Sequence, residues 1–181
     1  MKQNRIFLAF FIALFILGSL YAQDAETPQV SLPDRNVRKW DTFPYSLGAG
    51  AEFGINSRDT FSLGYSAALD RYLYNPHTAL GLRGTMYNDF ATITATEAEL
   101  TFRLYILELW NGAVFSQFGF GAVFYSEEER RGNTYIMDFV LGYRYYFQKG
   151  LFRGFYLEPV VRVGYPFEWS AGLFVGHWFS F

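Results

Sequence analysis

Side chains capable of acid–base, nucleophilic or metal chemistry are few in this chain of 181 residues. The sequence holds no cysteine and two histidines, His77 and His177, which excludes disulfides, thiolate metal sites and a cysteine nucleophile. His77 follows Asn75-Pro76, a dipeptide typical of a turn. His177 and Ser180 are three residues apart, so on a strand they point to opposite faces and cannot form a dyad. We therefore predict no enzymatic activity, no cofactor and no metal ion.

Charged side chains are the remaining candidates, and they follow a pattern. Ten charged residues occupy polar positions within segments where apolar and polar residues alternate. They are Glu52, Asp70, Arg83, Glu97, Glu99, Arg103, Asp138, Arg144, Glu158 and Arg162. Opposite charges on one face of a sheet attract each other across strands. We assign nine of them, all except Asp70, to one ion-pair network.

The segments that position these charges are about ten residues long and alternate with a period of two, as β-strands do. In YSLGAGAEFGI, residues 45–55, apolar side chains at odd positions alternate with Ser, Gly and Glu at even positions. Similar segments cover residues 61–70, 79–87, 96–107, 113–125, 134–147, 153–165 and 169–181. The sequence therefore predicts eight strands.

The polar face of these strands is rich in glycine and serine. Glycine is a poor residue for an exposed strand surface but suits a cramped interior. We therefore turn the apolar face toward lipid and the polar face toward a narrow lumen. Segment length matches the roughly 9–11 residues that a tilted strand needs to cross a bilayer. Because an open sheet edge in lipid leaves backbone groups unpaired, the sheet must close. We predict an all-β fold, an eight-stranded antiparallel transmembrane β-barrel of meander topology, over residues 45–181.

The segment before the barrel has the form of an export signal. Lys2 and Arg5 precede an apolar run over residues 6–20, and Ala22 is a small residue suited to cleavage. A membrane anchor is the alternative, but it would need about 20 apolar residues. We predict a signal peptide over residues 1–22 and a polar lead-in over residues 23–44. The net charge of −2, with no basic cluster, argues against a nucleic acid partner.

The C-terminal segment LFVGHWFSF places Val175, Phe179 and Phe181 at alternate positions. This series resembles the end signal of bacterial outer-membrane barrels, and residues 45–181 resemble the small eight-stranded barrels of the OmpA, OmpX and OmpW type. The resemblance implies residence in outer-membrane lipid of a diderm bacterium, after export with a cleaved signal peptide and escort by periplasmic chaperones. It also implies that the barrel-assembly machinery reads Phe179 and Phe181.

The longest connection expected on the outer side, counting strands from a periplasmic start, is SEEERRGN, residues 126–133. Its charged residues are Glu127, Glu128, Glu129, Arg130 and Arg131. Such a loop could bind an extracellular ligand. Its composition favours a solvated hairpin tip, in which Gly132-Asn133 forms the turn.

Side chains just fill the interior of an eight-stranded barrel. We therefore expect the charged network to plug the lumen, and a structural or surface-interaction role for the protein. A porin-like narrow channel or small-ligand carrier is the alternative. A large apolar inward patch would support a carrier. The inward apolar side chains, tyrosines and Trp178 aside, are Val123, Ile136, Val140, Val160 and Phe174.

Turn positions also predict which charges meet between the sixth and seventh strands. The link FQKGLF joins these strands, and antiparallel pairing centred on Gly150 would place Asp138 directly opposite Arg162. The same pairing would place Arg144 diagonal to Glu158.

Further contacts follow from the other strands. Arg83 should meet Glu97 or Glu99 across the turn between the third and fourth strands, and Glu52, which lacks a charged neighbour, should reach across the lumen. Glycines on the first, second and eighth strands should leave room for the arginine side chains. Pro159 has no N–H to donate, so we expect a bulge or a strained spot there.

Overall fold

The protein is described by a computed structural model over residues 45–56, 60–73, 77–88, 93–127, 130–165 and 167–179. The predicted signal peptide and lead-in, together with Phe181, lie outside the described residues. The described elements are β1 (Tyr45–Asn56), β2 (Phe61–Tyr72), β3 (Thr78–Asn88), β4 (Ile93–Leu109), β5 (Gly112–Glu127), β6 (Arg130–Tyr146), the short 3-10 helix η1 (Gly150–Phe152), β7 (Phe155–Tyr165) and β8 (Phe167–Phe179). In these ranges no helix is long and apolar enough to cross a membrane.

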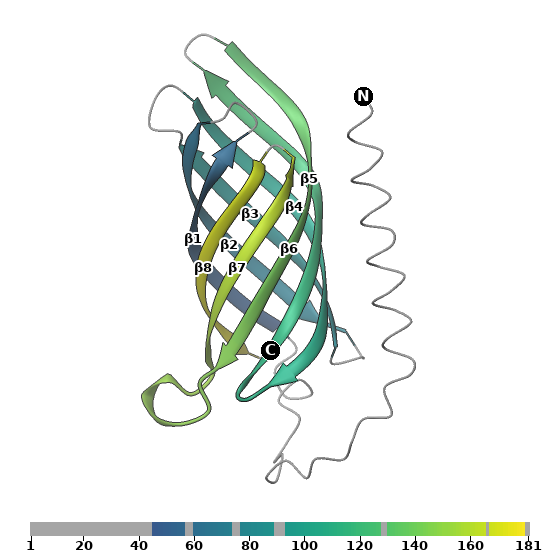
Figure 1. Ribbon diagram of the computed structural model, residues 1–181, viewed down its shortest axis with the longest axis vertical. Helices are drawn as coiled ribbons and strands as arrows, with labels where there is room; N and C mark the ends of the chain where they lie inside the picture. The colour runs from purple at the N-terminus through teal and green to yellow at the C-terminus, as the bar shows by residue number, and fades with distance from the viewer. Residues whose placement is uncertain are drawn as a thin grey trace. The chain divides into compact units, whose positions relative to one another are not determined.

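The strands form one closed antiparallel barrel in which each strand pairs with the next along the chain (Figure 1). Pairing between β1 and β8 closes the sheet and runs from Tyr45–Phe179 to Ile55–Trp169 before the register shifts at Asn56. At the start of this seam the rings of Tyr45 and Phe179 stack, with their centroids 6.1 Å apart. The predicted all-β, eight-stranded meander is confirmed.

The barrel has two ends, which we name from the start of β1. The near end holds Tyr45 and the β2–β3, β4–β5 and β6–β7 connections, and the far end holds the other four. β4, β5 and β6 contain 17, 16 and 17 residues, whereas the other strands contain 11 to 13. As a result the β5–β6 hairpin rises beyond the other far-end connections (Figure 1).

The loop predicted over residues 126–133 is wrong in its bounds. The ladder continues through Ser126–Arg131 to Glu127–Arg130, so only Glu128 and Glu129 lie outside the described residues. Gly132, expected in the turn, is a strand residue that pairs with Tyr125 and lies against its ring. Nothing in this stretch interrupts cross-strand pairing, so the two strands extend past the length a membrane requires.

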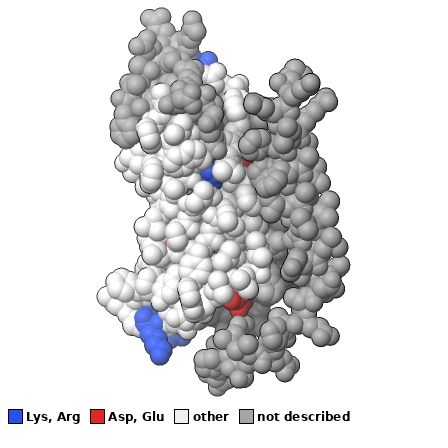
Figure 2. All heavy atoms as spheres, in the orientation of Figure 1, with Lys and Arg blue, Asp and Glu red and all other residues white. Residues whose placement is uncertain are grey.

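The two faces of the barrel carry the predicted side chains. Apolar residues such as Leu82, Phe120 and Leu173 point outward and are exposed, whereas all ten ionisable residues identified above are buried inside. Arg71 and Glu108 are exposed charges, and both lie at the near-end termini of their strands, β2 and β4. Figure 2 shows one side of this surface, mostly uncharged, with lysine and arginine gathered near its lower end.

Pro159 lies on the outward face of β7, and of the bulge or strained spot expected there, the bulge is absent. The pairing of β6 with β7 skips the residues opposite Pro159 and resumes in the same register, from Gly142–Val160 to Tyr145–Leu157. Pairing of Pro159 with Leu173 on the other side is uninterrupted. The missing N–H therefore opens a local gap in one ladder without shifting it.

Three inward glycines, Gly48, Gly64 and Gly176, make room for aromatic rings, where the sequence led us to expect arginines. Gly48 and Gly176 are paired across the β1–β8 seam, and a Cβ on either would collide with the Tyr156 ring. A Cβ on Gly64 would meet Tyr87 in the same way. Tyrosine rings from β3 and β7 thus occupy the space that a side chain at these glycines would fill.

Candidate functional site

The lumen holds two groups of charged side chains at different heights. The far-end cluster comprises Glu52, Arg83, Glu97, Glu99, Asp138 and Arg162, and the near-end cluster comprises Asp70, Arg103, Arg144 and Glu158. All ten side chains are at most 5% exposed. The structure thus divides the single network expected from sequence into two clusters.

Arg162 on β7 is the centre of the far-end cluster. Its Nε pairs with Asp138, its Nη2 lies 2.9 Å from Glu97 Oε2, and its Nη1 lies 3.6 Å from Glu52 Oε1. Nη1 also donates to the Tyr87 hydroxyl. Three acids from β1, β4 and β6 therefore share one guanidinium.

Arg83 is the second guanidinium of the far-end cluster. It pairs with Glu52, which reaches across the lumen from β1, and its Nε lies 3.2 Å from Glu99 Oε1. Ser66 and Ser170 donate to the two Glu52 oxygens over 3.0 and 2.9 Å. Hydroxyl groups from β2 and β8 thereby complete the surroundings of this carboxylate.

The near-end cluster is a ring of alternating charges. Arg103 Nη1 lies 3.1 Å from both Asp70 Oδ2 and Glu158 Oε2. Arg144 Nη2 lies 3.0 Å from Asp70 Oδ2, and its Nε pairs with Glu158. Two acids and two bases from β2, β4, β6 and β7 therefore balance each other.

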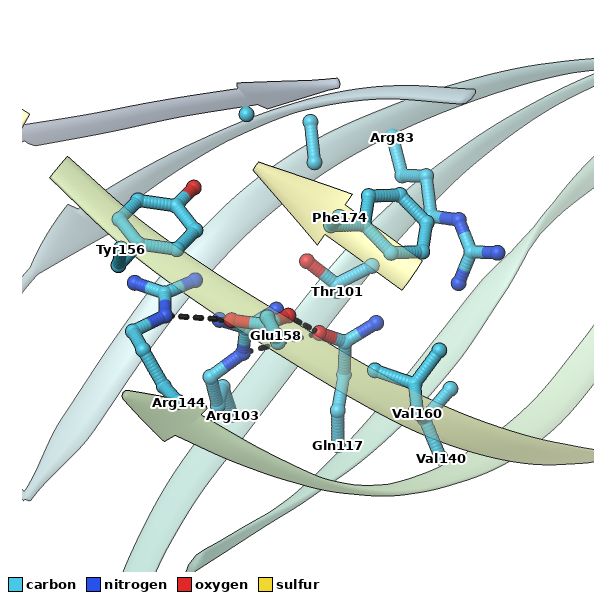
Figure 3. A pocket seen from close by; sticks show the side chains of 12 residues that line it. Arg83, Thr101, Arg103, Gln117, Val140, Arg144, Tyr156, Glu158, Val160 and Phe174 are labelled. Carbon is cyan, nitrogen blue, oxygen red and sulfur yellow. Dashed lines mark hydrogen bonds and ion pairs between the residues drawn. The ribbon is translucent and has the colours of Figure 1, made fainter. Parts of the chain in front are cut away.

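Aromatic rings and polar groups fix both near-end guanidiniums. The Arg144 Cζ lies 4.0 Å from the Tyr156 ring centroid, and the Arg103 Cζ lies 4.2 Å from that of Phe115. Arg103 also donates through Nε and Nη2 to Gln117 Oε1, over 3.0 and 2.7 Å. In Figure 3, Arg103 and Arg144 both turn toward Glu158. Stacking and hydrogen bonds leave these side chains little freedom.

Asp70 belongs to the near-end cluster, although it was the one strand acid not assigned to the network. Its partners Arg103 and Arg144 come from β4 and β6, neither of which is a neighbour of β2. Because ion pairs were expected mainly between adjacent strands, Asp70 was left without a partner. A count of charges could have identified Asp70, because Arg103 had no acid assigned to it.

The register between β6 and β7 differs from the prediction by two residues. Val140, not Asp138, lies directly opposite Arg162, and Asp138 lies opposite Gly164. Asp138 and Arg162 still pair, on a diagonal, because both point inward. The 3-10 helix in the connection moves the centre of the hairpin away from Gly150.

Little space remains between the clusters. A cavity of about 10 Å³ is lined by both, and by Val140, Val160 and Phe174 among others (Figure 3). This volume is at the lower limit for one water molecule. Phe115, a buried lumen residue missing from the predicted apolar set, occupies the adjoining space beneath Arg103. Below them the rings of Tyr146 and Trp178 pack with centroids 4.8 Å apart at the near end.

The histidines take no part in the lumen. His77 is exposed in the β2–β3 connection, and its carbonyl oxygen accepts a hydrogen bond from the Tyr105 N–H over 2.7 Å. His177 lies on the outward face and packs edge-on against Phe155, with ring centroids 4.9 Å apart. Over the described ranges, no group of three or more His, Cys, Asp or Glu side chains could hold a metal ion.

Solved structures share this architecture. Neisserial surface protein A superposes with a TM-score of 0.58 at 10% identity, over 76% of this chain and 97% of that chain. The N-terminal β-barrel domain of Pseudomonas aeruginosa OprF superposes with a TM-score of 0.51 at 18% identity, over 74% and 97%. At these identities the similarity concerns the fold alone. The chain has the architecture of the small eight-stranded bacterial outer-membrane β-barrels.

No model of a protein family matches the chain, and no curated protein matches it.

Proposed function

We propose that the protein is an integral barrel of the bacterial outer membrane whose lumen is plugged by its own salt bridges. Its role is structural or lies at the cell surface, not in solute passage. The supporting observation is the filling of the lumen: every lumen arginine pairs with at least two acids, and the cavity between the clusters is about 10 Å³. Aromatic rings at the near end add a further layer.

We expect the barrel to be closed to ions at neutral pH. The purified, folded barrel should give no stable channels in planar bilayers, because guanidinium–carboxylate pairs and rings leave no continuous water path. A small porin reconstituted in the same bilayers is the positive control. Stable, concentration-dependent channels from the wild-type protein would favour the channel and overturn the plug.

The β5–β6 hairpin is the part of the barrel that we assign to the cell exterior. It is the longest projection at the far end, and the exposed Arg131 lies on it. A peptide tag inserted after Glu128 should bind antibody on intact cells, since the barrel starts in the periplasm. A matched tag after Gly150, in the near-end connection, should bind only after the outer membrane is opened. The reverse pattern would invert this topology.

Export and assembly complete the proposal. The signal peptide delivers the chain to the periplasm, chaperones keep it unfolded, and the assembly machinery reads the terminal aromatic series. Deleting Phe181 should therefore reduce the amount of barrel inserted into the outer membrane more than it lowers the free energy of unfolding after refolding in detergent. Phe61→Ala, at an exposed far-end aromatic, should leave insertion unchanged. Normal insertion without Phe181 would contradict the recognition role.

A further inference from the structure

The two lumen clusters differ in their charge balance. The near-end cluster has two carboxyls and two guanidiniums, whereas the far-end cluster has four carboxyls, Glu52, Glu97, Glu99 and Asp138, for the two guanidiniums of Arg83 and Arg162. All four carboxyls are at most 3% exposed. An unbalanced buried carboxylate is costly, and a bound cation or proton removes the cost.

Glu99 is the carboxyl with the fewest partners. Among the described residues neither of its oxygens has a hydrogen-bond partner, because the 3.2 Å contact with Arg83 lacks the required geometry. Asp138 uses Oδ2 to accept from Arg162, and its Oδ1 is likewise without a donor. A buried acceptor that is left without a donor is expected to cost about 1–3 kcal/mol.

The unpartnered oxygens of these two residues both approach Gly119, a position of β5 without a side chain. β5 lies between β4, which carries Glu99, and β6, which carries Asp138. A Cβ placed on Gly119 of β5 would collide with both Glu99 Oε2 and Asp138 Oδ1. The two oxygens therefore lie close to one point, and the missing Cβ leaves room for a contact between them.

We propose that Glu99 and Asp138 bind one proton between them, and that closure of the far half of the lumen depends on this proton. The proton comes from solvent and forms an O–H···O bond between Oε2 and Oδ1, which satisfies both free acceptors at once. The proposal extends the proposed plugged lumen and rests on it.

The other groups that face this pair do not supply a donor or a cation for its two unpartnered oxygens. From β1 comes Glu52, from β3 Arg83 and Tyr87, from β4 Glu97, and from β7 Arg162. The described part of β5 adds glycine at this level, β8 adds Ser170, and β2 adds Ser66. Both arginines are already engaged with other acids. A metal ion would need more oxygen ligands than two converging atoms provide, in line with the absence of a three-residue metal cluster in the described ranges.

Loss of the proton at alkaline pH would set two carboxylates against each other in a low-dielectric interior. Repulsion would push the Glu99 and Asp138 side chains apart and weaken the ion pairs that both make. The far half of the lumen would then loosen, whereas the balanced near-end cluster would not.

Infrared spectroscopy of the folded barrel tests the site directly. At neutral pH the wild-type protein should show the C=O stretch of one protonated carboxyl, shifted in D2O. Glu99→Gln and Asp138→Asn should each remove this band, since the amide can donate to the remaining carboxylate in place of the shared proton. Glu108→Gln, at an exposed position of β4, should retain it. Absence of the band in the wild type, or its survival in either lumen variant, would overturn the proposal. So would a stoichiometric metal ion in its place.

Conductance at alkaline pH tests the consequence. Wild-type barrels closed at neutral pH should begin to conduct at the pH where the infrared band disappears, and Asp138→Asn barrels should stay closed there. Wild-type barrels that stay closed after losing the band would refute the pH dependence of closure. Conduction at every pH would refute the plugged lumen instead, while the infrared result would still decide the proton site.

Discussion

Replacing Arg162 by alanine should lower the free energy of unfolding by about 3–5 kcal/mol, the cost of removing one member of a buried ion pair. Arg162 contacts Asp138, Glu97 and Glu52 in a cluster that already has excess negative charge. Its loss leaves Arg83 as the one guanidinium among four carboxyls. Urea unfolding of the detergent-folded barrel measures the change.

Two further variants serve as controls for Arg162→Ala. Arg131→Ala, at an exposed far-end position, should leave both stability and conductance unchanged. Arg162→Lys should recover part of the loss, because it restores the charge but not the forked geometry that serves several acids. If Arg162→Ala proves neutral in both urea unfolding and conductance, the far-end cluster does not hold the barrel together.

Gly176→Ala should destabilise the barrel by about 1–3 kcal/mol, as overpacking of a filled interior does. The added methyl would collide with the Tyr156 ring and with the backbone oxygen of Leu47. Tyr156 is buried and stacked against Arg144, so a shift of this ring would disturb the near-end cluster. The strand β8 also forms the closing seam, which leaves the backbone little freedom to yield.

Gly84→Ala is the matched control for Gly176→Ala, since both add one methyl to a strand glycine. Gly84 points outward, and the nearest atom to its added Cβ would be Glu97 O at 3.8 Å. This substitution should be neutral or stabilising by up to about 1 kcal/mol, because alanine is less flexible than glycine in the unfolded chain. Equal effects of the two substitutions in urea unfolding would show that Tyr156 does not depend on the bare backbone at Gly176.

The alternation of side chains determined the fold class and the face of the ten charged residues on the polar positions. Each strand of the barrel was found from its own residues, and the inward placement of Glu52, Asp138 and Arg162 followed from position alone. A strand has a period of two, so the face of a residue is a local property. The need to leave no edge in lipid then determined closure.

Tertiary structure decided which inward charges meet. Asp70 contacts arginines from two strands that are not its neighbours, and Asp138 meets Arg162 diagonally because the hairpin centre is displaced from Gly150. Register and stagger around a closed barrel set the height of each residue. A local pattern contains neither quantity, so contacts across the lumen could not be read from it.

The division of the charges into a balanced near-end cluster and an acidic far-end cluster also belongs to the tertiary structure. The polar positions of the strands carry six acids and four arginines, and therefore an excess of acid, but the sequence does not show where the excess lies. The packing of Tyr156 and Phe115 against Arg144 and Arg103 holds two arginines at the near end and leaves two for the far end. Glycines at 119 and 176 then determine which groups approach, because a missing Cβ acts only on the side chains that the closed sheet brings against it.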